Sequence, residues 1–200
     1  MSKFRSQNPT ITEVTICNGG SLPMRHKYFG QGTRVVGIDL EPACKKYQTD
    51  ATWIFIGDQG DREFWRTLLD EVGQVAIIVD DGGHHSGQHI ITLEACLTNL
   101  RPGGILLIEN VQGGDNRFLA YLNQLAKDFL ALTEVTTLRY PSKTVEDYKV
   151  QPLLLQQYVK SIALFPYCVI RERNDYVHTN LTTIRAGSQW ELFSHASKGK

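Results

Sequence analysis

The sequence lacks an excess of charge, a long apolar run and a secretion signal. Lys and Arg together number 21, as do Asp and Glu, so the formal net charge is zero and no basic nucleic-acid-binding surface is expected. No apolar run approaches the roughly 18 residues that a membrane-spanning helix needs, and residues 1–10 have no apolar core of a signal peptide. These absences predict a cytoplasmic protein that binds neither nucleic acid nor membrane.

The chain is also poor in cysteine. It has four cysteines and no C-x-x-C motif, which favours reduced thiols in the cytoplasm. Its 200 residues fit a single domain, 1–200, that buries about 70% of the surface of the unfolded chain. Residues 1–10 are expected to form a short N-terminal segment and residues 191–200 a loose tail. The cysteines are Cys17, Cys44, Cys96 and Cys168.

Apolar, β-branched runs that end in turn residues predict five strands alternating with helices. This alternation indicates a parallel sheet with helices on both faces. A hard turn is expected at residues 101–104, between the fourth helix and the fifth strand. The expected strands are 11–16, 34–40, 52–56, 75–79 and 105–108, and the expected helices are 21–29, 41–47, 61–72, 86–100 and 116–132.

The alternation stops in the last third of the chain. Residues 133–157 have no clean period, and a short helix is expected around residues 153–159. Two further strands, 162–171 and 181–185, joined by a polar hairpin, would add an antiparallel edge. We therefore expect an α/β, doubly wound, Rossmann-like sheet of seven strands, mostly parallel with an antiparallel C-terminal hairpin, flanked by helices. A flavodoxin-like sheet of five strands is the alternative.

Polar residues and glycines follow each of the five expected parallel strands. Ligands of open α/β sheets bind beyond the carboxyl ends of the strands, so these marks predict one binding site along that edge. The marks are E-x-x-x-C-N-G-G-S at 13–21, G-I-D at 37–39, I-G-D-Q at 56–59, D-D-G-G-H-H at 80–85, and L-R-P-G-G with I-E-N at 100–110.

The first three marks have the chemistry of a nucleoside site. Gly19 and Gly20 let a ligand approach the backbone before a helix N-terminus, which attracts anions; a plain tight turn is the alternative. Asp39 follows Gly19 by 20 residues and is placed to accept ribose hydroxyls or to cap the next helix. Asp58 and Gln59 either contact a ligand or form an Asx turn.

The D-D-G-G-H-H run at residues 80–85 is the candidate reactive centre. A hydroxyl nucleophile must lose its proton, and histidine suits this because its pKa is near neutral. A divalent ion also lowers the pKa of a hydroxyl, and the hard oxygens of aspartate suit Mg²⁺. For His85 and His89 we favour a polar position at the helix start with no role in the chemistry.

These five marks and the order of elements resemble class I S-adenosylmethionine-dependent methyltransferases, most closely the macrolide sugar O-methyltransferase and cephalosporin-hydroxylase-type group. The resemblance is strongest over residues 13–110. It implies a methyltransferase-like domain that transfers a methyl group from S-adenosyl-L-methionine to a hydroxyl of a small-molecule acceptor, in secondary metabolism. The residues implied to hold the cofactor are Glu13, Cys17, Asn18, Gly19, Gly20, Ser21, Asp39, Asp58, Gln59 and Asp80.

The resemblance also implies catalytic and metal-binding residues. His84 matches the general base of the family, and Asp81 matches its metal-binding carboxylate, which also serves the reaction. The second metal carboxylate of the family falls on the pair Glu109-Asn110. Asp81, Glu109 and Asn110 would therefore hold an ion such as Mg²⁺.

Three features depart from the family pattern. Thr15 stands where the family has the first glycine of its loop, and its side chain is expected to crowd the methionine part of the cofactor. Asn110 replaces an aspartate, so it brings no charge to a metal. Only about ten residues precede the first expected strand, where family members carry a helical segment over the cofactor. A more open site, with poorer exclusion of water, is therefore expected.

These departures keep two other functions open. The first is a methyltransferase-like protein that has lost or changed its activity and serves as a repurposed enzyme or binding partner. The second is a dinucleotide-dependent oxidoreductase, which Asp39 fits, although residues 17–20 do not supply G-x-G-x-x-G.

An apolar run near the C-terminus bears on oligomeric state. Residues 162–170 read IALFPYCVI, which is long for an exposed edge strand. Exposed apolar edges are usually covered or paired because they promote aggregation. We therefore expect a homodimer.

Overall fold

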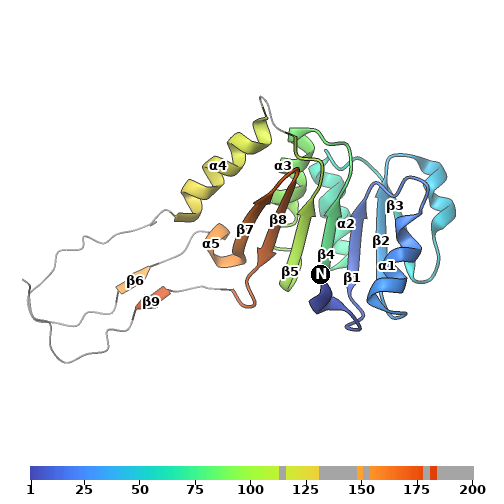
Figure 1. Cartoon of the computed structure of the whole chain (residues 1–200), viewed down its shortest axis with the longest axis horizontal. Helices are drawn as coiled ribbons and strands as arrows, with labels where there is room; N and C mark the ends of the chain where they lie inside the picture. Colours follow the sequence, from blue (N-terminus) through green and yellow to red (C-terminus); the bar gives the residue numbers. More distant parts are fainter. Residues whose placement is uncertain (113–115, 131–147, 151–153, 178–180, 184–200) are drawn as a thin grey trace, which may run out of the picture.

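The structure is a computed structural model that describes residues 1–112, 116–130, 148–150, 154–177 and 181–183. Its main sheet has the strand order β3-β2-β1-β4-β5-β8-β7, and β6 pairs with β9 in a separate sheet (Figure 1). The strands are β1 Thr10–Val14, β2 Arg34–Asp39, β3 Thr52–Ile56, β4 Val75–Asp80, β5 Leu100–Ile108, β6 Tyr148–Val150, β7 Val159–Phe165, β8 Cys168–Arg173 and β9 Leu181–Thr183. The helices are α1 Ser21–Phe29, α2 Arg62–Val72, α3 Ser86–Ala95, α4 Arg117–Leu130 and α5 Leu154–Tyr158, with 3₁₀ turns η1 Ser2–Phe4 and η2 Pro42–Tyr47.

The first five strands are parallel, and β4 lies at the centre of the core. All six residues of β4 are buried, as expected for a strand of a parallel sheet covered on both faces. Val14 of β1 pairs with both Ile38 and Asp80, and Asp80 pairs with Ile108. The carboxyl ends of β1, β2, β4 and β5 are therefore level with one another, and the residues that follow them meet at one edge.

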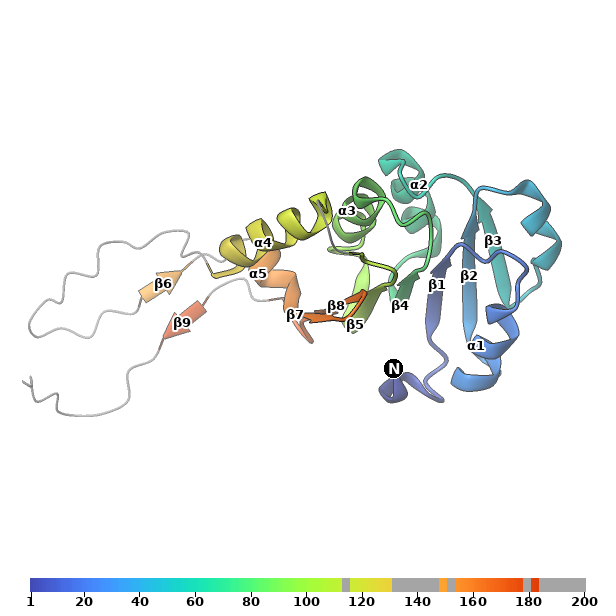
Figure 2. The ribbon, with the colours of Figure 1, turned by 45° about the horizontal axis from the view of Figure 1, so that its top comes forward.

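Helices cover the two faces of the sheet unequally. Helices α2, α3 and α4 pack on one face, and α1 lies on the other (Figure 2). The α2 helix begins after Asp61, whose carboxylate accepts the N–H of Glu63, and buries Trp65 completely. The expected doubly wound sheet of seven strands is confirmed. Among the described helices, none is long and apolar enough to span a membrane.

The bounds predicted for the antiparallel hairpin are wrong. Residues 162–171 form parts of two strands, β7 and β8, because Pro166 has no N–H to continue a ladder and Tyr167 turns the chain at a φ of 61°. Strand β8 is antiparallel to β5 and β7. The strand predicted at 181–185 is described only as the short β9, which pairs with β6 and does not extend the main sheet.

The predicted turn at residues 101–104 is also wrong, because these residues lie inside β5. Gly103 adopts a φ of 68° and its N–H bonds to the carbonyl of Asn174 at 3.2 Å, so the chain bends without leaving the sheet. The pairing with β4 shifts register between Val75 and Ile77 to absorb the bend. The expected short helix near residue 153 is present as α5, whereas most of 133–157 and the tail 191–200 lie outside the described residues.

Candidate functional site

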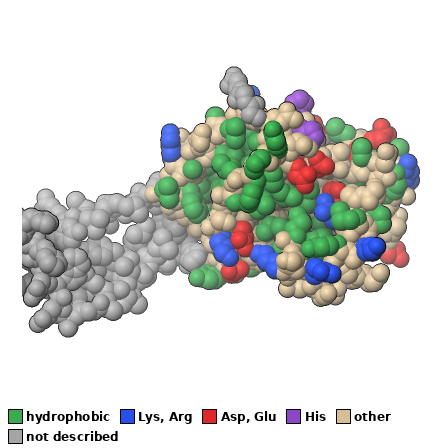
Figure 3. Space-filling model, viewed as in Figure 1, with side chains coloured by type: hydrophobic (Ala, Val, Ile, Leu, Met, Phe, Trp, Pro, Cys, Tyr) green, Lys and Arg blue, Asp and Glu red, His purple; other side chains and the backbone are tan. Residues whose placement is uncertain are grey.

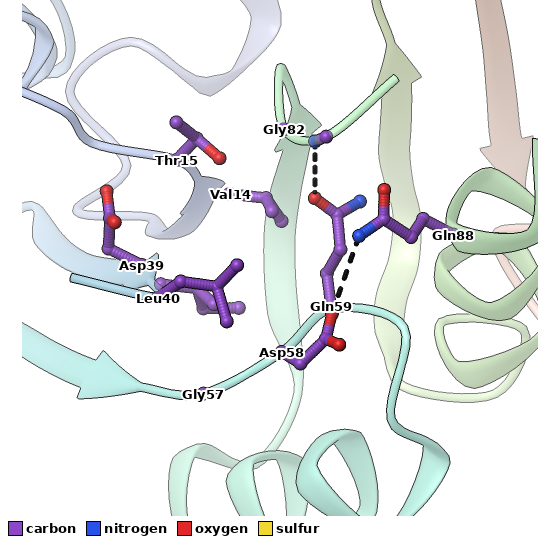
Figure 4. A pocket seen from close by; sticks show the side chains of 11 residues that line it. Val14, Thr15, Asp39, Leu40, Gly57, Asp58, Gln59, Gly82 and Gln88 are labelled. Carbon is purple, nitrogen blue, oxygen red and sulfur yellow. Dashed lines mark hydrogen bonds between the residues drawn. The ribbon is translucent and has the colours of Figure 1, made fainter. Parts of the chain in front are cut away.

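The candidate site lies where the strand order reverses between β1 and β4, the usual ligand position in α/β sheets. Histidine and acidic side chains gather at this edge of the molecule (Figure 3). A pocket of about 230 Å³ opens there, with Thr15 and Asp39 on one side and Gln59 and Gln88 on the other (Figure 4). Its lining comprises Val14, Thr15, Ile38, Asp39, Leu40, Gly57, Asp58, Gln59, Gly82, Gly83 and Gln88.

The carboxylate of Asp39 ties the loops after β1 and β2 together. Its Oδ2 accepts the N–H groups of Ile16 at 3.1 Å and Cys17 at 3.0 Å, and its Oδ1 accepts the N–H of Glu41 at 3.0 Å. Burial raises the pKa of Asp39, but these backbone bonds and one with Cys44 outweigh it and hold the pKa below its usual value. Because a carboxylate oxygen accepts more than one hydrogen bond, Oδ1 keeps capacity for a ligand hydroxyl.

The loop after β1 is shaped by alternate left-handed residues. Cys17 and Gly19 adopt φ values of 49° and 69°, which turns successive N–H groups to the same side, as in anion-binding nests. A Cβ at Gly19 would lie 2.8 Å from the ring of Tyr47, so glycine is required there on packing grounds. A Cβ at Gly20 would contact nothing within 4 Å, which leaves the approach to the start of α1 open.

Thr15 is strained in this loop. It adopts a φ of 66°, a conformation that is unfavourable for a β-branched residue and easy for glycine. Its N–H bonds to the carbonyl of Ile38 at 2.8 Å, which holds it in place, and its half-buried side chain lines the pocket. The backbone at this position therefore retains a geometry suited to glycine.

Gln59 fixes the turn that follows β4. Its side chain donates to Asp80 Oδ1 at 2.9 Å and accepts the N–H of Gly83 at 2.9 Å, while its carbonyl accepts the indole N–H of Trp65 at 2.8 Å. A Cβ at Gly82 would overlap the Gln59 amide, so glycine is needed there. The structure thus uses both ends of this amide to position the segment that carries the reactive candidates.

Asp58 and Gln88 form the polar wall opposite Asp39. The Oδ1 atom of Asp58 accepts the N–H of Gly60 at 2.7 Å, which is the Asx turn considered above, and the side-chain N–H of Gln88 at 3.4 Å. The side-chain carbonyl oxygen of Gln88 is buried and accepts no hydrogen bond within the described part of the chain. Because a buried oxygen is out of reach of a ligand, the acceptor that this wall presents to the pocket is the carboxylate of Asp58.

Asp81, His84 and Asn110 meet at the exposed rim. The side-chain amide of Asn110 donates to Asp81 Oδ1 at 2.8 Å and lies 3.5 Å from Nε2 of His84. His84 and Asn110 have φ values of 56° and 57°, which are uncommon outside glycine and are often found at functional sites. The structure thus brings together three of the predicted site residues, and their roles in catalysis and metal binding stay predictions.

A buried ion pair supports this rim from the α1 side. Arg25 donates to Glu13 at 3.0 Å, and their side chains are 13% and 6% exposed. The charges of both groups act on Glu109. Burial raises the pKa of Glu109, and the negative charges of Asp81 and Glu13 raise it further. The positive charge of Arg25 and the nearby His84 lower it, and the net change is a rise. Glu13, predicted to contact the cofactor, is thus also the structural partner of Arg25.

The metal ligands implied by the family do not fit an ion in this arrangement. Asn110 directs its amide N–H, not its carbonyl oxygen, at the Asp81 oxygen that would bind the ion. Over the described ranges, no three His, Cys, Asp or Glu side chains converge closely enough to hold a metal. A divalent ion needs several oxygen ligands around it, so Asn110 would have to release Asp81 first.

The remaining predicted residues lie on the same edge of the sheet. Asn18 is exposed in the loop after β1, and Ser21 is the first residue of α1. Asp80 is fully buried beneath the pocket. The assignment of these residues to cofactor binding stays a prediction.

The two histidines for which no chemical role is expected lie at the start of α3 and within it. His85 precedes the helix and makes no side-chain capping bond. His89 is buried against Phe118 at 5.2 Å between ring centroids. Gln88 and Arg25 were missed by the sequence analysis, because their helical positions give no pattern that distinguishes a site residue from a surface one.

Comparison with known proteins gives several matches, although no family model matches the chain. It is 29% identical over 116 residues to the 8-demethyl-8-alpha-L-rhamnosyl tetracenomycin-C 2'-O-methyltransferase of Streptomyces olivaceus, covering 54% of this chain and 30% of that protein. It is 36% identical over 95 residues to the 8-demethyl-8-(2-methoxy-alpha-L-rhamnosyl)-tetracenomycin-C 3'-O-methyltransferase of the same organism, covering 46% and 23%. Demethylmacrocin O-methyltransferase of Streptomyces fradiae is 28% identical over 116 residues, covering 54% and 29%.

Among solved structures, the MycE methyltransferase from the mycinamycin biosynthetic pathway, in complex with Mg and SAH, superposes with a TM-score of 0.70. The match covers 87% of this chain and 47% of that one at 18% identity, so it bears on the fold alone. A putative rRNA methylase from Clostridium thermocellum superposes with a TM-score of 0.50 at 16% identity, covering 86% and 92%.

The fold is that of a class I S-adenosylmethionine-dependent methyltransferase. Within that class, the sequence matches are to O-methyltransferases of tetracenomycin and macrolide sugars, which confirms the resemblance predicted from the strand-end marks. The matched segment spans less than a third of the length of these curated relatives and about half of MycE.

The strain at Thr15 predicts that Thr15→Gly stabilises the protein. Relief of the left-handed conformation is worth about 1–2 kcal/mol, and the added freedom of the unfolded chain takes back about 0.5–1 kcal/mol, so the gain should be about 1 kcal/mol in urea denaturation. Thr67→Gly, in the middle of the exposed face of α2, should instead destabilise by about 0.3 kcal/mol, because glycine is a poorer helix former than threonine. A Thr15→Gly protein less stable than the parent would contradict the strain.

The low pKa of Asp39 predicts a pH-dependent contribution to stability. A depressed pKa gives stability that is fully present above the unfolded value of 3.8 and is lost as the pH falls from there through the lower folded value. Asp39→Asn should therefore lower the free energy of unfolding by about 1–2 kcal/mol at pH 7, and the difference from the parent should shrink only as the pH falls below 3.8. Exposed Asp50→Asn is the control. If the stability difference between the parent and Asp39→Asn did not change with pH, the charge of Asp39 would make no contribution to stability.

Proposed function

We propose that this chain is an S-adenosylmethionine-dependent O-methyltransferase that acts on a hydroxyl of a small molecule of secondary metabolism. The observation that carries the proposal is the Asp39 carboxylate, held by the loop after β1 at the mouth of a pocket, in a chain similar to sugar O-methyltransferases. A carboxylate in this position accepts hydrogen bonds from the hydroxyl groups of a ribose.

The pocket fits the nucleoside part of the cofactor. Asp39 would accept hydrogen bonds from the ribose hydroxyls, and Asp58 would accept one from the amino group of the base. Gly82 and Gly83 let the turn that lines this pocket pass close to Gln59 and Gln88, because a Cβ on either glycine would overlap those side chains. When bound, S-adenosylmethionine supplies a methyl group on a positively charged sulfur.

The methionine end would lie along the loop of residues 15–21, which runs to the start of α1. Gly20 is open to approach, and the first N–H groups of α1 favour a carboxylate. Thr15 narrows this passage, since its side chain lines the pocket. We therefore expect Thr15 to weaken, and not to abolish, cofactor binding.

His84 is the proposed general base. Its Nε2 lies at the long end of hydrogen-bond distance from Asn110 Nδ2, at 3.5 Å, so its lone pair is available for the proton of the acceptor hydroxyl. As that oxygen bonds to the methyl carbon, the carbon–sulfur bond breaks and its electron pair stays on sulfur. Asp81, linked to Asn110 beside His84, supplies negative charge that stabilises the protonated imidazole.

The acceptor class is proposed from the relatives. Two of them are named for methyl transfer to the 2' and 3' positions of a rhamnosyl group on tetracenomycin, and another for the macrolide demethylmacrocin. We propose a sugar hydroxyl of a glycosylated polyketide as the acceptor. The exposed rim around His84 is compatible with such a large molecule.

A cytoplasmic location is proposed from the thiols. Cys17, Cys44, Cys96 and Cys168 are all free, and free thiols persist in reducing compartments. Cys96 is fully buried, which raises its pKa to about 12 and leaves it unreactive.

Calorimetric titration and product assays test the proposed function. The chain should bind S-adenosylmethionine, Asp39→Ala should weaken binding at least about 10-fold because charged hydrogen bonds are lost, and exposed Asp70→Ala should not. His84→Ala should bind the cofactor normally but form S-adenosylhomocysteine about 10²–10⁴-fold more slowly with a panel of glycosylated polyketides. Failure to bind at millimolar cofactor would end the proposal, and full activity of His84→Ala would favour a repurposed protein.

The edge strand β7 supports the predicted homodimer. It ends the main sheet, and Leu164 and Phe165 are 63% and 53% exposed. Light scattering at micromolar concentration should give twice the mass of one chain, and Leu164→Lys with Phe165→Lys should give a monomer, whereas Met24→Lys on α1 should not change the mass. A monomeric parent chain would refute this proposal.

A further inference from the structure

The bond between Asp81 and Asn110 joins the ends of two neighbouring parallel strands. Asp80 pairs with Ile108 in the β4–β5 register, and the N–H of Glu109 donates to the carbonyl of Asp80 at 2.9 Å. Asp81 and Asn110 therefore leave the sheet side by side, and their side chains meet at 2.8 Å. Any residue at position 110 must be compatible with the charge of Asp81.

A carboxylate at position 110 would need a cation. Two carboxylates at this distance repel each other, and a divalent ion between them is a common way to hold them. Asparagine has the same shape, carries no charge and donates an N–H directly to Asp81. The amide therefore orients Asp81 and satisfies one of its oxygens without an ion, and Asp81 keeps its negative charge.

The nearest described cation to this rim is already paired with another carboxylate. The guanidinium of Arg25 is fixed in the ion pair with Glu13 at 3.0 Å. At the rim itself, the group that Asp81 meets is the amide N–H of Asn110, at 2.8 Å. A divalent ion would therefore find one carboxylate fewer here than in a protein with aspartate at position 110.

We propose that the Asp81–Asn110 hydrogen bond replaces a divalent ion, so that methyl transfer by this chain does not require one. The inference rests on the proposed function for its meaning but not for its test, because ion binding is measured without substrate. His84 then takes the proton of the acceptor hydroxyl beside Asn110, whose Nδ2 lies 3.5 Å from its Nε2. Restoring aspartate at position 110 should create an ion site.

Titration with Mn²⁺, followed by the loss of its free electron paramagnetic resonance signal, tests the inference. Asn110→Asp should bind Mn²⁺ at least about 10-fold more tightly than the parent, and Asp81→Asn in that background should abolish the gain. Asn123→Asp, which adds the same charge on the exposed face of α4, controls for non-specific attraction. Because aspartate tolerates the left-handed backbone as asparagine does, folding of Asn110→Asp is expected, and circular dichroism checks it.

Two results would overturn the inference. One is parent protein that binds Mn²⁺ as tightly as Asn110→Asp and loses it on Asp81→Asn; the other is an Asn110→Asp protein that binds no better than Asn123→Asp. In activity assays, parent protein treated with EDTA should keep its rate, whereas loss of that rate with recovery on adding Mg²⁺ would also refute it. Failure to bind S-adenosylmethionine would instead end the proposed function, and the Mn²⁺ titration would still decide this inference.

Discussion

The carboxylate of Asp39 is the interaction on which the site depends. By accepting N–H groups from both the loop after β1 and the segment after β2, it holds two strand ends in one fixed relation. The left-handed backbone of the first loop follows from it, because only that conformation turns the N–H groups of Ile16 and Cys17 towards the same oxygen. The strain at Thr15 is the cost of keeping this geometry without glycine.

Side-chain amides complete the site on the other strands. Gln59 holds the glycine turn after β4, Gln88 reaches Asp58, and Asn110 holds Asp81. A side-chain amide carries no charge, so it can hold a carboxylate through an N–H without adding charge, and Gln59 also accepts an N–H with its oxygen. Beyond Arg25, therefore, the carboxylates of the pocket and rim are held by neutral N–H donors and keep their negative charge, which suits a site that takes a cofactor with its own positive charge.

The sequence predicted the parallel sheet and the meeting of Asp81, His84 and Asn110, because apolar runs mark buried strands and parallel strands end at one edge. It did not predict the break at Pro166, since the apolar pattern continues through the turn, or the strand at residues 101–104, where Gly103 bends without ending the ladder. Arg25 and Gln88 could not be found, since tertiary packing brings them to the site. The role of Asn110 as a donor required the geometry of its amide.

A crystal structure of the chain grown with S-adenosylhomocysteine and Mg²⁺ tests the account most directly. The account predicts ribose hydroxyls on Asp39, the base between Asp58 and the turn of residues 82–83, and an Asp81–Asn110 hydrogen bond with no ion beside it. A nucleoside bound away from Asp39 would contradict the assigned pocket. A magnesium ion bound by both Asp81 and the carbonyl oxygen of Asn110 would contradict the replacement of the ion by the amide.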